Sequence, residues 1–238
     1  MFHDALMGSM MRKKDIVTPA TLGAEIWLSA TAIEGANEND NIGTMPDVID
    51  GVDAVQVEAA KQPTYQVIDG VPYLLFDGSN DFMEAPYDYE AKYDLTSEIT
   101  IGYNMVIASD ASDGFVWASY HGGPDFSANM SSGLLRGRHN AGTHGEIDST
   151  PLGKSFFVLH SNDDGAFVID ANGEQIQHDG TTGSLARFAS LILGGRYNPS
   201  FPAGYRDFAK CYIKDWFLIP RLLTPAEKTT LYANREAY

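Results

Sequence analysis

Residues 191–232 constrain the fold more than any other part of this sequence. Their centre, residues 208–219, is a run of alternating side chains without a helical period. In this run Tyr212, Lys214, Trp216 and Leu218 alternate with Cys211, Ile213, Asp215, Phe217 and Ile219. Such alternation predicts a long strand that is half-buried on a β-sandwich. Pro220 ends the strand, because proline cannot donate to a hydrogen-bond ladder.

The elements on either side of this strand have clear patterns too. Before it, Leu191-Ile192-Leu193 is a short apolar run closed by Gly194-Gly195, which predicts a buried strand followed by a turn. After it, Thr224 is followed by Pro225 and then by Glu227, three positions after the threonine. This capping-box pattern predicts a short terminal helix with Pro225 at its first position.

The front of the chain supplies segments that match this tail. Ile26-Trp27-Leu28-Ser29-Ala30 predicts an opening strand, Pro63-Thr64-Tyr65 follows, and residues 70–82 have the sequence G-V-P-Y-L-L-F-D-G-S-N-D-F. With the tail, these segments resemble concanavalin A-like, laminin-G-like jelly-roll domains over roughly residues 19–238. The resemblance implies an all-β sandwich of two antiparallel sheets with a short C-terminal helix. It also implies that the last strand pairs near the first.

The middle of the chain predicts further strands joined by turns. Asp69-Gly70 separates two strand-like runs and predicts a hairpin, and Asp77 predicts a second turn. Residues 99–108 predict a strand whose apolar face carries Ile99, Ile101, Tyr103, Met105 and Ile107. Strands are also expected at 115–120, 156–160 and 166–170. Residues 121–150 are rich in glycine and histidine, so we expect loops there around a short strand at Leu134-Leu135.

Composition favours one β-rich domain, residues 19–238, preceded by an arm, residues 1–18. The 238 residues include 12 Phe, 12 Tyr, 3 Trp, 23 Gly and 11 Pro, spread along the chain. Cys211 is the single cysteine, so an intrachain disulfide is impossible and the fold must hold by burial. No run of 18 apolar residues exists, so no membrane-spanning helix is predicted.

The net charge of −16 is concentrated in the first half of the chain. Residues 1–119 carry 20 acidic and 5 basic side chains, whereas residues 120–238 carry 12 acidic and 11 basic ones. An acidic body repels nucleic acid and anionic membranes, so neither is expected as a partner. Alternatively, the same charge serves only to keep the protein surface solvated and the protein soluble.

The N-terminal arm combines apolar anchors with three consecutive cations. We expect it either to be a frayed terminus or to attach the protein to a partner surface. Its cations follow the apolar residues, whereas a secretory signal has the opposite order, so we expect no signal peptide. The candidate attachment residues are Phe2, Leu6, Met7, Met10, Met11, Arg12, Lys13 and Lys14.

Catalytic and metal-binding patterns are incomplete. Glu146-Ile147-Asp148 resembles the strand motif of jelly-roll glucanases, but the sequence continues Ser149-Thr150-Pro151 and lacks the second glutamate. Hydrolysis with retention needs two carboxyl groups about 5–5.5 Å apart, so we expect no enzymatic activity. The histidines at 121, 139 and 144 lack metal-ligand spacing, and the Asn/Asp-rich segment 31–53 lacks the offsets of a calcium loop. We therefore expect neither a metal nor a cofactor.

A binding surface remains as the candidate site. Aromatic rings stack on sugars, and Arg or Asn side chains supply directional hydrogen bonds. The same residues also fit a role in stabilising the sheet or lining a protein contact. The candidate ligand-binding residues are Trp117, Tyr120, Arg136, Arg138, His139, Asn140 and Tyr197.

Three functions are compatible with these patterns. The leading hypothesis is a non-enzymatic structural or adhesive virion protein, such as a bacteriophage head decoration, head fibre or tail-associated subunit, assembled in the host cytoplasm. Its partners would be capsid or tail proteins, copies of itself, and host surface glycans. The first alternative is a lectin-like carbohydrate-binding module. The second is a glycoside hydrolase of the jelly-roll glucanase type.

Overall fold

The computed structural model describes most of the chain from residue 16 onward. The described residues are 16–49, 51–87, 98–108, 110, 113–120, 127–131, 134–139, 142–147, 155–163, 166–172, 174–179, 190–197 and 204–236. For several strand residues between 120 and 179 only the backbone course is described. All the predicted arm residues, from Phe2 to Lys14, lie outside this set.

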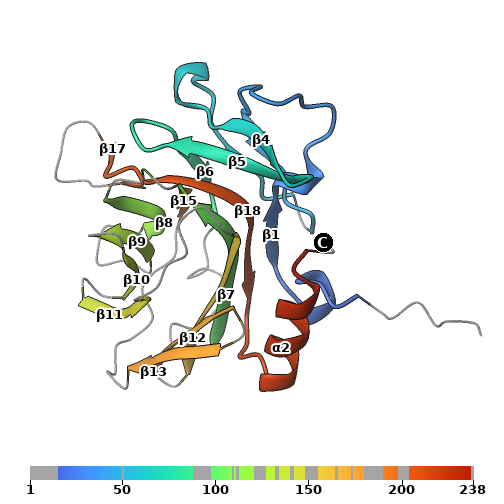
Figure 1. Ribbon diagram of the computed structural model, residues 1–238, viewed down its shortest axis with the longest axis vertical. Helices are drawn as coiled ribbons and strands as arrows, with labels where there is room; N and C mark the ends of the chain where they lie inside the picture. Colours follow the sequence, from blue (N-terminus) through green and yellow to red (C-terminus); the bar gives the residue numbers. More distant parts are fainter. Residues whose placement is uncertain are drawn as a thin grey trace, which may run out of the picture.

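Two antiparallel sheets, each of eight strands within the described residues, form the body of the protein (Figure 1). Sheet A has the order β14-β13-β12-β7-β18-β5-β4, and β1 also pairs with β18. Its strands are β1 (Ile26–Ser29), β4 (Thr64–Ile68), β5 (Val71–Asp77), β7 (Ile99–Ile107), β12 (Ser155–Asp163), β13 (Ala166–Ala171), β14 (Glu174–Asp179) and β18 (Lys210–Ile219). The pairing of β1 with β18 joins the first strand to the last, as the resemblance to jelly-roll domains implies.

Sheet B has the order β11-β10-β9-β8-β15-β6-β3-β2. Its strands are β2 (Thr44–Met45), β3 (Ala54–Val55), β6 (Met83–Ala85), β8 (Gly114–Tyr120), β9 (Ser127–Ser131), β10 (Leu134–His139), β11 (Gly142–Ile147) and β15 (Ser190–Leu193). A separate ribbon pairs β16 (Arg196–Tyr197) with β17 (Tyr205–Arg206). The chain also has the helix α2 (Pro225–Asn234) and the short 3-10 turns η1 (Ala20–Leu22), η2 (Ala30–Ala32) and η3 (Ala59–Lys61). The all-β sandwich with a C-terminal helix is therefore confirmed.

The main core lies between the two sheets. All five residues predicted for the apolar face of β7 belong to it: Ile99, Ile101, Tyr103, Met105 and Ile107. At its centre the ring of Trp117 packs edge-on against Tyr103 and Trp216, with ring centroids 5.9 Å apart in both pairs. Burial of such large apolar rings in close packing is a major stabilising contribution in a sandwich core.

Strand β18 changes its buried face at a bulge. Opposite β7, Ile213 pairs with Met105 and Asp215 pairs with the next residue, Asn104, so Lys214 is the extra residue. Before the bulge Cys211 and Ile213 point between the sheets, whereas after it Trp216 and Leu218 do. The uninterrupted alternation predicted from the sequence is therefore wrong, because one extra residue reverses every side chain that follows.

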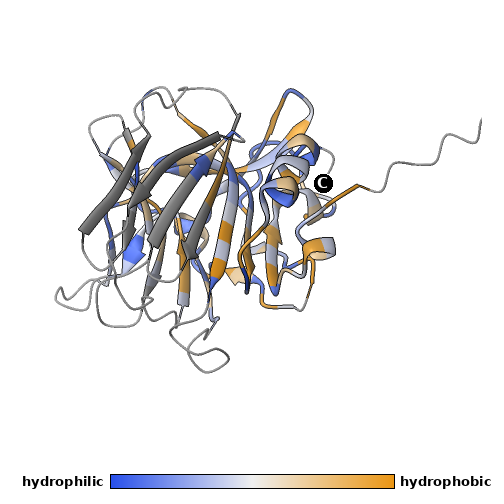
Figure 2. Cartoon of the chain, turned by 90° about the horizontal axis from the view of Figure 1, so that it is seen from below, coloured by the Kyte–Doolittle hydropathy of each residue, from blue (hydrophilic) through white to orange (hydrophobic). Residues whose placement is uncertain are grey.

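A second core lies on the outer face of sheet A, beneath helix α2 (Figure 1). Phe217 and Ile219 point there, opposite to Trp216, and pack with Phe157 of β12 and Leu231 of the helix. Phe217 lies directly over Gly102, where an added Cβ would come within 2.0 Å of its ring. In Figure 2 the hydrophobic residues of the described strands and of the neighbouring helical segments are drawn in orange. The fold thus has three layers, with sheet A in the middle.

Local signals in the sequence predicted the helix start correctly. The Thr224 hydroxyl accepts from the Glu227 backbone N–H at 3.3 Å, and the Glu227 carboxylate accepts from the Thr224 N–H at 2.8 Å. Arg221 donates to both Glu227 oxygens, at 2.8 and 3.1 Å. These bonds, first those from Arg221 and then that from Thr224, lower the pKa of Glu227 to about 2. Among the described residues, no helix is long and apolar enough to cross a membrane.

The two predicted turns are confirmed as well. Between β4 and β5, Asp69 and Gly70 both have positive φ, 52° and 82°, as a tight hairpin requires. The Asp77 carboxylate accepts from the backbone N–H groups of Ser79 and Asn80, which fixes the turn after β5.

The turn at Asp77 also holds the buried carboxyl group of Asp81, and this gives a pH-dependent prediction. Burial, and next the charge of Asp77, raise the pKa of Asp81 from 3.8 to about 6. Because the pKa of Asp81 is higher in the folded protein than in the unfolded chain, its contribution to stability is fully present below about pH 4. This contribution is lost as the pH rises through about 6. Asp81→Asn should therefore stabilise the protein by about 1 kcal/mol at pH 7.5, after solvent screening, and bring little at pH 4.5. Urea denaturation at both pH values measures this, and an equal effect at both would contradict it.

The region predicted to be loops, residues 121–150, is largely strand where it is described. β9, β10 and β11 form an antiparallel meander at one edge of sheet B, and β10 pairs with β9 on one side and β11 on the other. His139 and His144 lie on these strands and not on loops. Pairing with neighbouring strands outweighs the weak strand preference of this glycine-rich segment.

The predicted arm, residues 1–18, joins the sandwich before its predicted end. Val17 packs against the second core, beside helix α2. The Thr18 backbone N–H donates to the Thr21 hydroxyl at 2.9 Å, at the start of η1. The chain is therefore attached to the sandwich by Val17, and the predicted attachment role of residues 2–14 stays a prediction.

Candidate functional site

Trp117 was predicted to bind ligand, and this prediction is wrong. Its side chain is fully buried between the sheets, against Tyr103 and Trp216. Trp117 pairs with Leu193 of β15, which faces the same core. The alternation of β8 defines two faces in the sequence, but only the packing of the sheets decides which of them is inward.

The other predicted residues lie on different elements. Arg136, Arg138 and His139 are on β10, which is separated from β15 by β9 and β8. Arg136 is half-buried and lies opposite Glu146 of β11 in the register. Tyr120 ends β8, and Asn140 lies outside the described residues. Tyr197 is on the ribbon, β16–β17, where its ring packs against Tyr205, a lining residue of the pocket described next.

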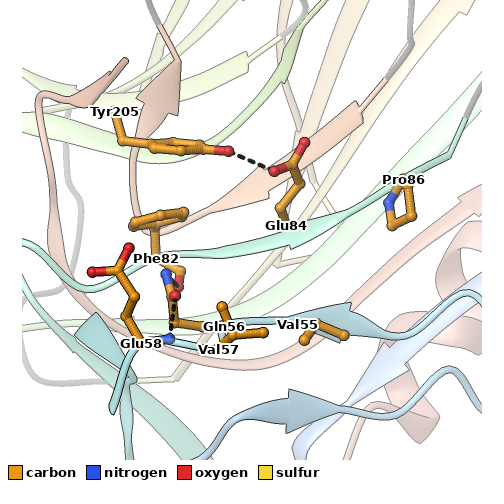
Figure 3. Close-up of a pocket in the computed structure, with 8 residues that line it drawn as sticks. All are labelled: Val55, Gln56, Val57, Glu58, Phe82, Glu84, Pro86 and Tyr205. Carbon is orange, nitrogen blue, oxygen red and sulfur yellow. Dashed lines mark hydrogen bonds between the residues drawn. The ribbon is translucent and has the colours of Figure 1, made fainter. Parts of the chain in front are cut away.

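A pocket of about 480 Å³ opens on the outer face of sheet B (Figure 3). It lies where β3, β6 and the ribbon come together. Its lining residues are Val55, Gln56, Val57, Glu58, Phe82, Glu84, Pro86 and Tyr205. A volume of this size falls in the range of about 300–1,000 Å³ that is typical of small-molecule sites.

The pocket forms because β3 separates from β6 after a single registered pair. Val55 lies opposite Glu84, and the two side chains share the outer face. Ala54, Met83 and Ala85 point the other way, into the core between the sheets. Beyond Val55 no further residue pairs with β6 in the described ladder, and residues 56–58 line the pocket beside it.

Gln56 fixes the floor of the pocket. Its side-chain amide donates to the Phe82 carbonyl at 3.2 Å, and its side-chain oxygen accepts from the Glu58 backbone N–H at 2.9 Å. Its backbone N–H donates to the Gly43 carbonyl at 2.9 Å. Because both polar ends of the side chain are used within the fold, Gln56 positions the neighbouring residues, and its polar groups are already engaged before any ligand arrives.

An aromatic stack forms one wall of the pocket. The rings of Phe82 and Tyr205 lie parallel, with centroids 3.9 Å apart and planes inclined by 21°. Tyr197, the partner of Tyr205 across the ribbon, packs edge-on against it at 5.3 Å. Phe208 adds a further ring contact to Phe82, at 6.4 Å. The stack anchors the ribbon to sheet B and presents ring edges to the pocket (Figure 3).

A hydrogen bond joins the aromatic wall to a carboxylate. The Tyr205 hydroxyl donates to Glu84 Oε2 at 2.5 Å. Burial of Tyr205, and next its hydrogen bond to Glu84, raise the pKa of the phenol, so Tyr205 stays protonated and remains a donor. The bond holds the Glu84 carboxylate in one orientation at the edge of the pocket (Figure 3).

Aliphatic side chains form the opposite rim. Val57 is 86% exposed and Val55 is 39% exposed, and both are among the exposed large apolar side chains of the described residues. Exposed valines beside a concave apolar surface offer area that a ligand can cover. Glu58 lies at the outer end of this rim and pairs with Lys61 at 2.8 Å.

Sequence reasoning missed this pocket almost completely. Its walls come from residues 55–58, 82–86 and 205, which are distant in sequence and meet only through the pairing of β3 with β6 and the docking of the ribbon. The one available signal was the aromatic, Pro- and Gly-rich loop after Arg196, which contains Tyr197 and Tyr205. Within the part of the chain that the structure describes, no three His, Cys, Asp or Glu side chains come together as metal ligands.

Solved structures of other proteins share this architecture. Trypanosoma rangeli sialidase in complex with 2,3-difluorosialic acid superposes with a TM-score of 0.65 at 17% identity, over 93% of this chain and 36% of that one. The binding domain of botulinum neurotoxin serotype D gives 0.64 at 13% identity, over 90% and 52%. The serotype D ligand-binding domain in complex with N-acetylneuraminic acid gives 0.61 at 12% identity, over 90% and 51%. The chain shares its fold with these proteins.

The likeness is one of fold, because the identities are far below those that carry function across. The chain spans only 36% to 52% of the length of the first two of these proteins. No family model matches the sequence, and no curated protein matches it.

Proposed function

We propose that this protein is a carbohydrate-binding β-sandwich that holds its ligand, without cleaving it, in the pocket between β3, β6 and β17. The observation that carries the proposal is the composition of the pocket wall. Ring edges and exposed valines lie beside a carboxylate that Tyr205 holds in place. Sugars offer the complementary groups, because their C–H surfaces pack against apolar side chains and their hydroxyl groups donate hydrogen bonds to a carboxylate.

The structural neighbours support a carbohydrate ligand. Structures of the sialidase and of the toxin domain contain sialic acid or a derivative of it, and both share the sandwich fold. This support is by analogy of fold, so the pocket has to carry the argument.

Binding without cleavage is the part of the proposal that separates this protein from an enzyme. A glycosidase that uses two carboxyl groups needs them on opposite sides of the bond that is cut. In this pocket Glu84 is bonded to Tyr205, and Glu58 is paired with Lys61. Both carboxylates are thus held by partners within the fold, and the proposal assigns them to ligand binding and to the rim, with no catalytic role. Of the glucanase-like motif, Glu146 and Ile147 belong to β11, at the other edge of sheet B from β2 and β3, and Asp148 lies outside the described residues.

A matched pair of substitutions tests the proposal. Val57→Asp places a charge on the pocket rim at a side chain that is 86% exposed, so the fold should be unaffected. Val67→Asp makes the same change at a 42% exposed residue on β4 of sheet A, away from the pocket. On a glycan array, Val57→Asp should lower the apparent affinity at least about tenfold, whereas Val67→Asp should bind as the parent does.

Two results would overturn the proposal. One is a parent protein that binds no glycan on a broad array. The other is glycan binding that Val57→Asp leaves unchanged, which would place the ligand elsewhere. Thermal unfolding of both variants within a degree or two of the parent ensures that the comparison concerns the site.

An adhesive role on a virus particle remains a further proposal, and glycan binding is compatible with it. It rests on the domain type and on the residues of the predicted arm, all of which lie outside the described set. Capsid or tail proteins as partners, and assembly into a homo-oligomer, are proposals that rest on the same two grounds.

A further inference from the structure

We infer that the pocket selects neutral, hydroxyl-rich sugars and rejects sugars that carry a carboxylate, such as sialic acid. This inference rests on the proposed function, because it assigns the class of glycan to the same pocket. It follows from where the described charged side chains lie around the pocket.

Glu84 makes the pocket an acceptor of hydrogen bonds. A carboxylate has about four lone-pair positions, and the Tyr205 hydroxyl uses one of them, on Oε2. Sugar hydroxyls are donors and match the remaining positions. A carboxylate on the ligand has no proton to donate at neutral pH and would face Glu84 as a like charge.

The described cations beside the pocket already have acidic partners within the fold. Lys61 binds Glu58 at 2.8 Å, on the outer rim. In the ribbon, side chains alternate, so Tyr197 and Tyr205 face one side and Arg196 and Arg206 the other.

The two ribbon arginines have partners on that other side. Arg196 binds Asp207 at 2.6 Å and lies over the ring of Phe115, with its guanidinium carbon 4.6 Å from the ring centroid. Arg206 also contacts Asp207, at 3.4 Å. The described residues that line the pocket include neither of these arginines. A ligand carboxylate would therefore face Glu84 in a pocket whose other glutamate, Glu58, is already paired with Lys61 and whose described lining contains no cation.

The field of the whole protein acts in the same direction. The net charge is −16, and most of it lies in residues 1–119, which supply every lining residue except Tyr205. An acidic surface lowers the local concentration of an anionic ligand, while a neutral sugar is unaffected.

The test uses one glycoprotein before and after enzymatic removal of its sialic acids, so that the two probes share the same underlying sugars. The parent protein should bind the desialylated form at least about tenfold more tightly than the intact form at 0.05 M salt. Glu84→Gln should lose most of this preference, because the amide removes the charge. It keeps an oxygen that accepts from Tyr205, so the ribbon should stay in place.

The outcomes separate the inference from the proposed function. Equal or tighter binding of the intact form, abolished by Val57→Asp, would overturn the inference and leave the pocket as a glycan site. An unchanged preference in a correctly folded Glu84→Gln would also overturn it. Binding of neither form, or binding indifferent to Val57→Asp, would overturn the proposed function itself.

Discussion

Trp216→Ala should lower the free energy of unfolding by about 3–5 kcal/mol, because it empties the centre of the core between the sheets. Trp216 is fully buried and its ring lies 5.9 Å from that of Trp117, at an angle of 71°. It pairs with Leu28 of β1 on one side and with Tyr103 of β7 on the other, so it lies between two neighbouring strands of sheet A. Urea denaturation followed by fluorescence or circular dichroism measures the loss.

Two further variants make this prediction specific to the bulged strand. Phe217→Ala should also cost about 3–5 kcal/mol, because Phe217 is fully buried on the opposite face, beneath helix α2. Trp216→Phe keeps an aromatic ring in the core and should cost less than Trp216→Ala. If both alanine variants melted within a degree or two of the parent, β18 would not lie between two packed layers.

Lys214→Met should destabilise the protein by about 3–5 kcal/mol at pH 7, because it leaves a buried carboxylate without its cation. Lys214 is 1% exposed and Asp215 is fully buried. The lysine Nζ lies 3.4 Å from Asp215 Oδ2 and donates to the Arg235 carbonyl at 2.7 Å, just after the end of α2. The other Asp215 oxygen accepts from Ser29 and from the Trp27 indole, so the pair links β1, β18 and the helix.

The loss caused by Lys214→Met should depend on pH. Burial raises the pKa of Asp215, and Lys214 is the first of the groups that counteract this rise. Without the lysine the pKa rises further, and the protonated form carries no charge that needs a partner. Stability that depends on a raised pKa is present at low pH and lost as the pH rises, so the variant should be closer to the parent at pH 4 than at pH 8.

Lys210→Met is the matched control for this prediction. Lys210 is on the same strand and pairs with Asp110 at 2.6 Å, but this pair lies at the surface. Surface ion pairs contribute little, so the melting temperature should stay within a degree or two of the parent. Equal losses in the two lysine variants would mean that burial does not decide the contribution of the pair at Asp215.

The elements predicted correctly from the sequence are those fixed by local chemistry. The hairpin at Asp69-Gly70 follows from positive φ at both residues, and the start of α2 follows from Thr224, Pro225 and Glu227. The inward face of β7 follows from its alternation alone. The strand pairs with β12 without a bulge, so its side chains keep alternating between the two faces along its whole length.

The features that the sequence did not predict depend on contacts between distant segments. The bulge at Lys214 is set by the register of β18 against β7, and it decides that Trp216, and not Phe217, faces the second sheet. The burial of Trp117 follows from the stacking of the two sheets. The pocket needs Val55, Phe82 and Tyr205 together, and no local pattern links residues so far apart in the chain.

The central claim is that a glycan occupies the pocket on sheet B, and methyl NMR of the valine-labelled protein tests it most directly. The protein is titrated with the neutral oligosaccharide that binds best on the array. The methyl resonances of Val55 and Val57, which line the pocket, should shift with ligand concentration, while those of Val67 on β4 should not. Shifts confined to valines outside the pocket, or no shifts at saturating ligand, would contradict the account.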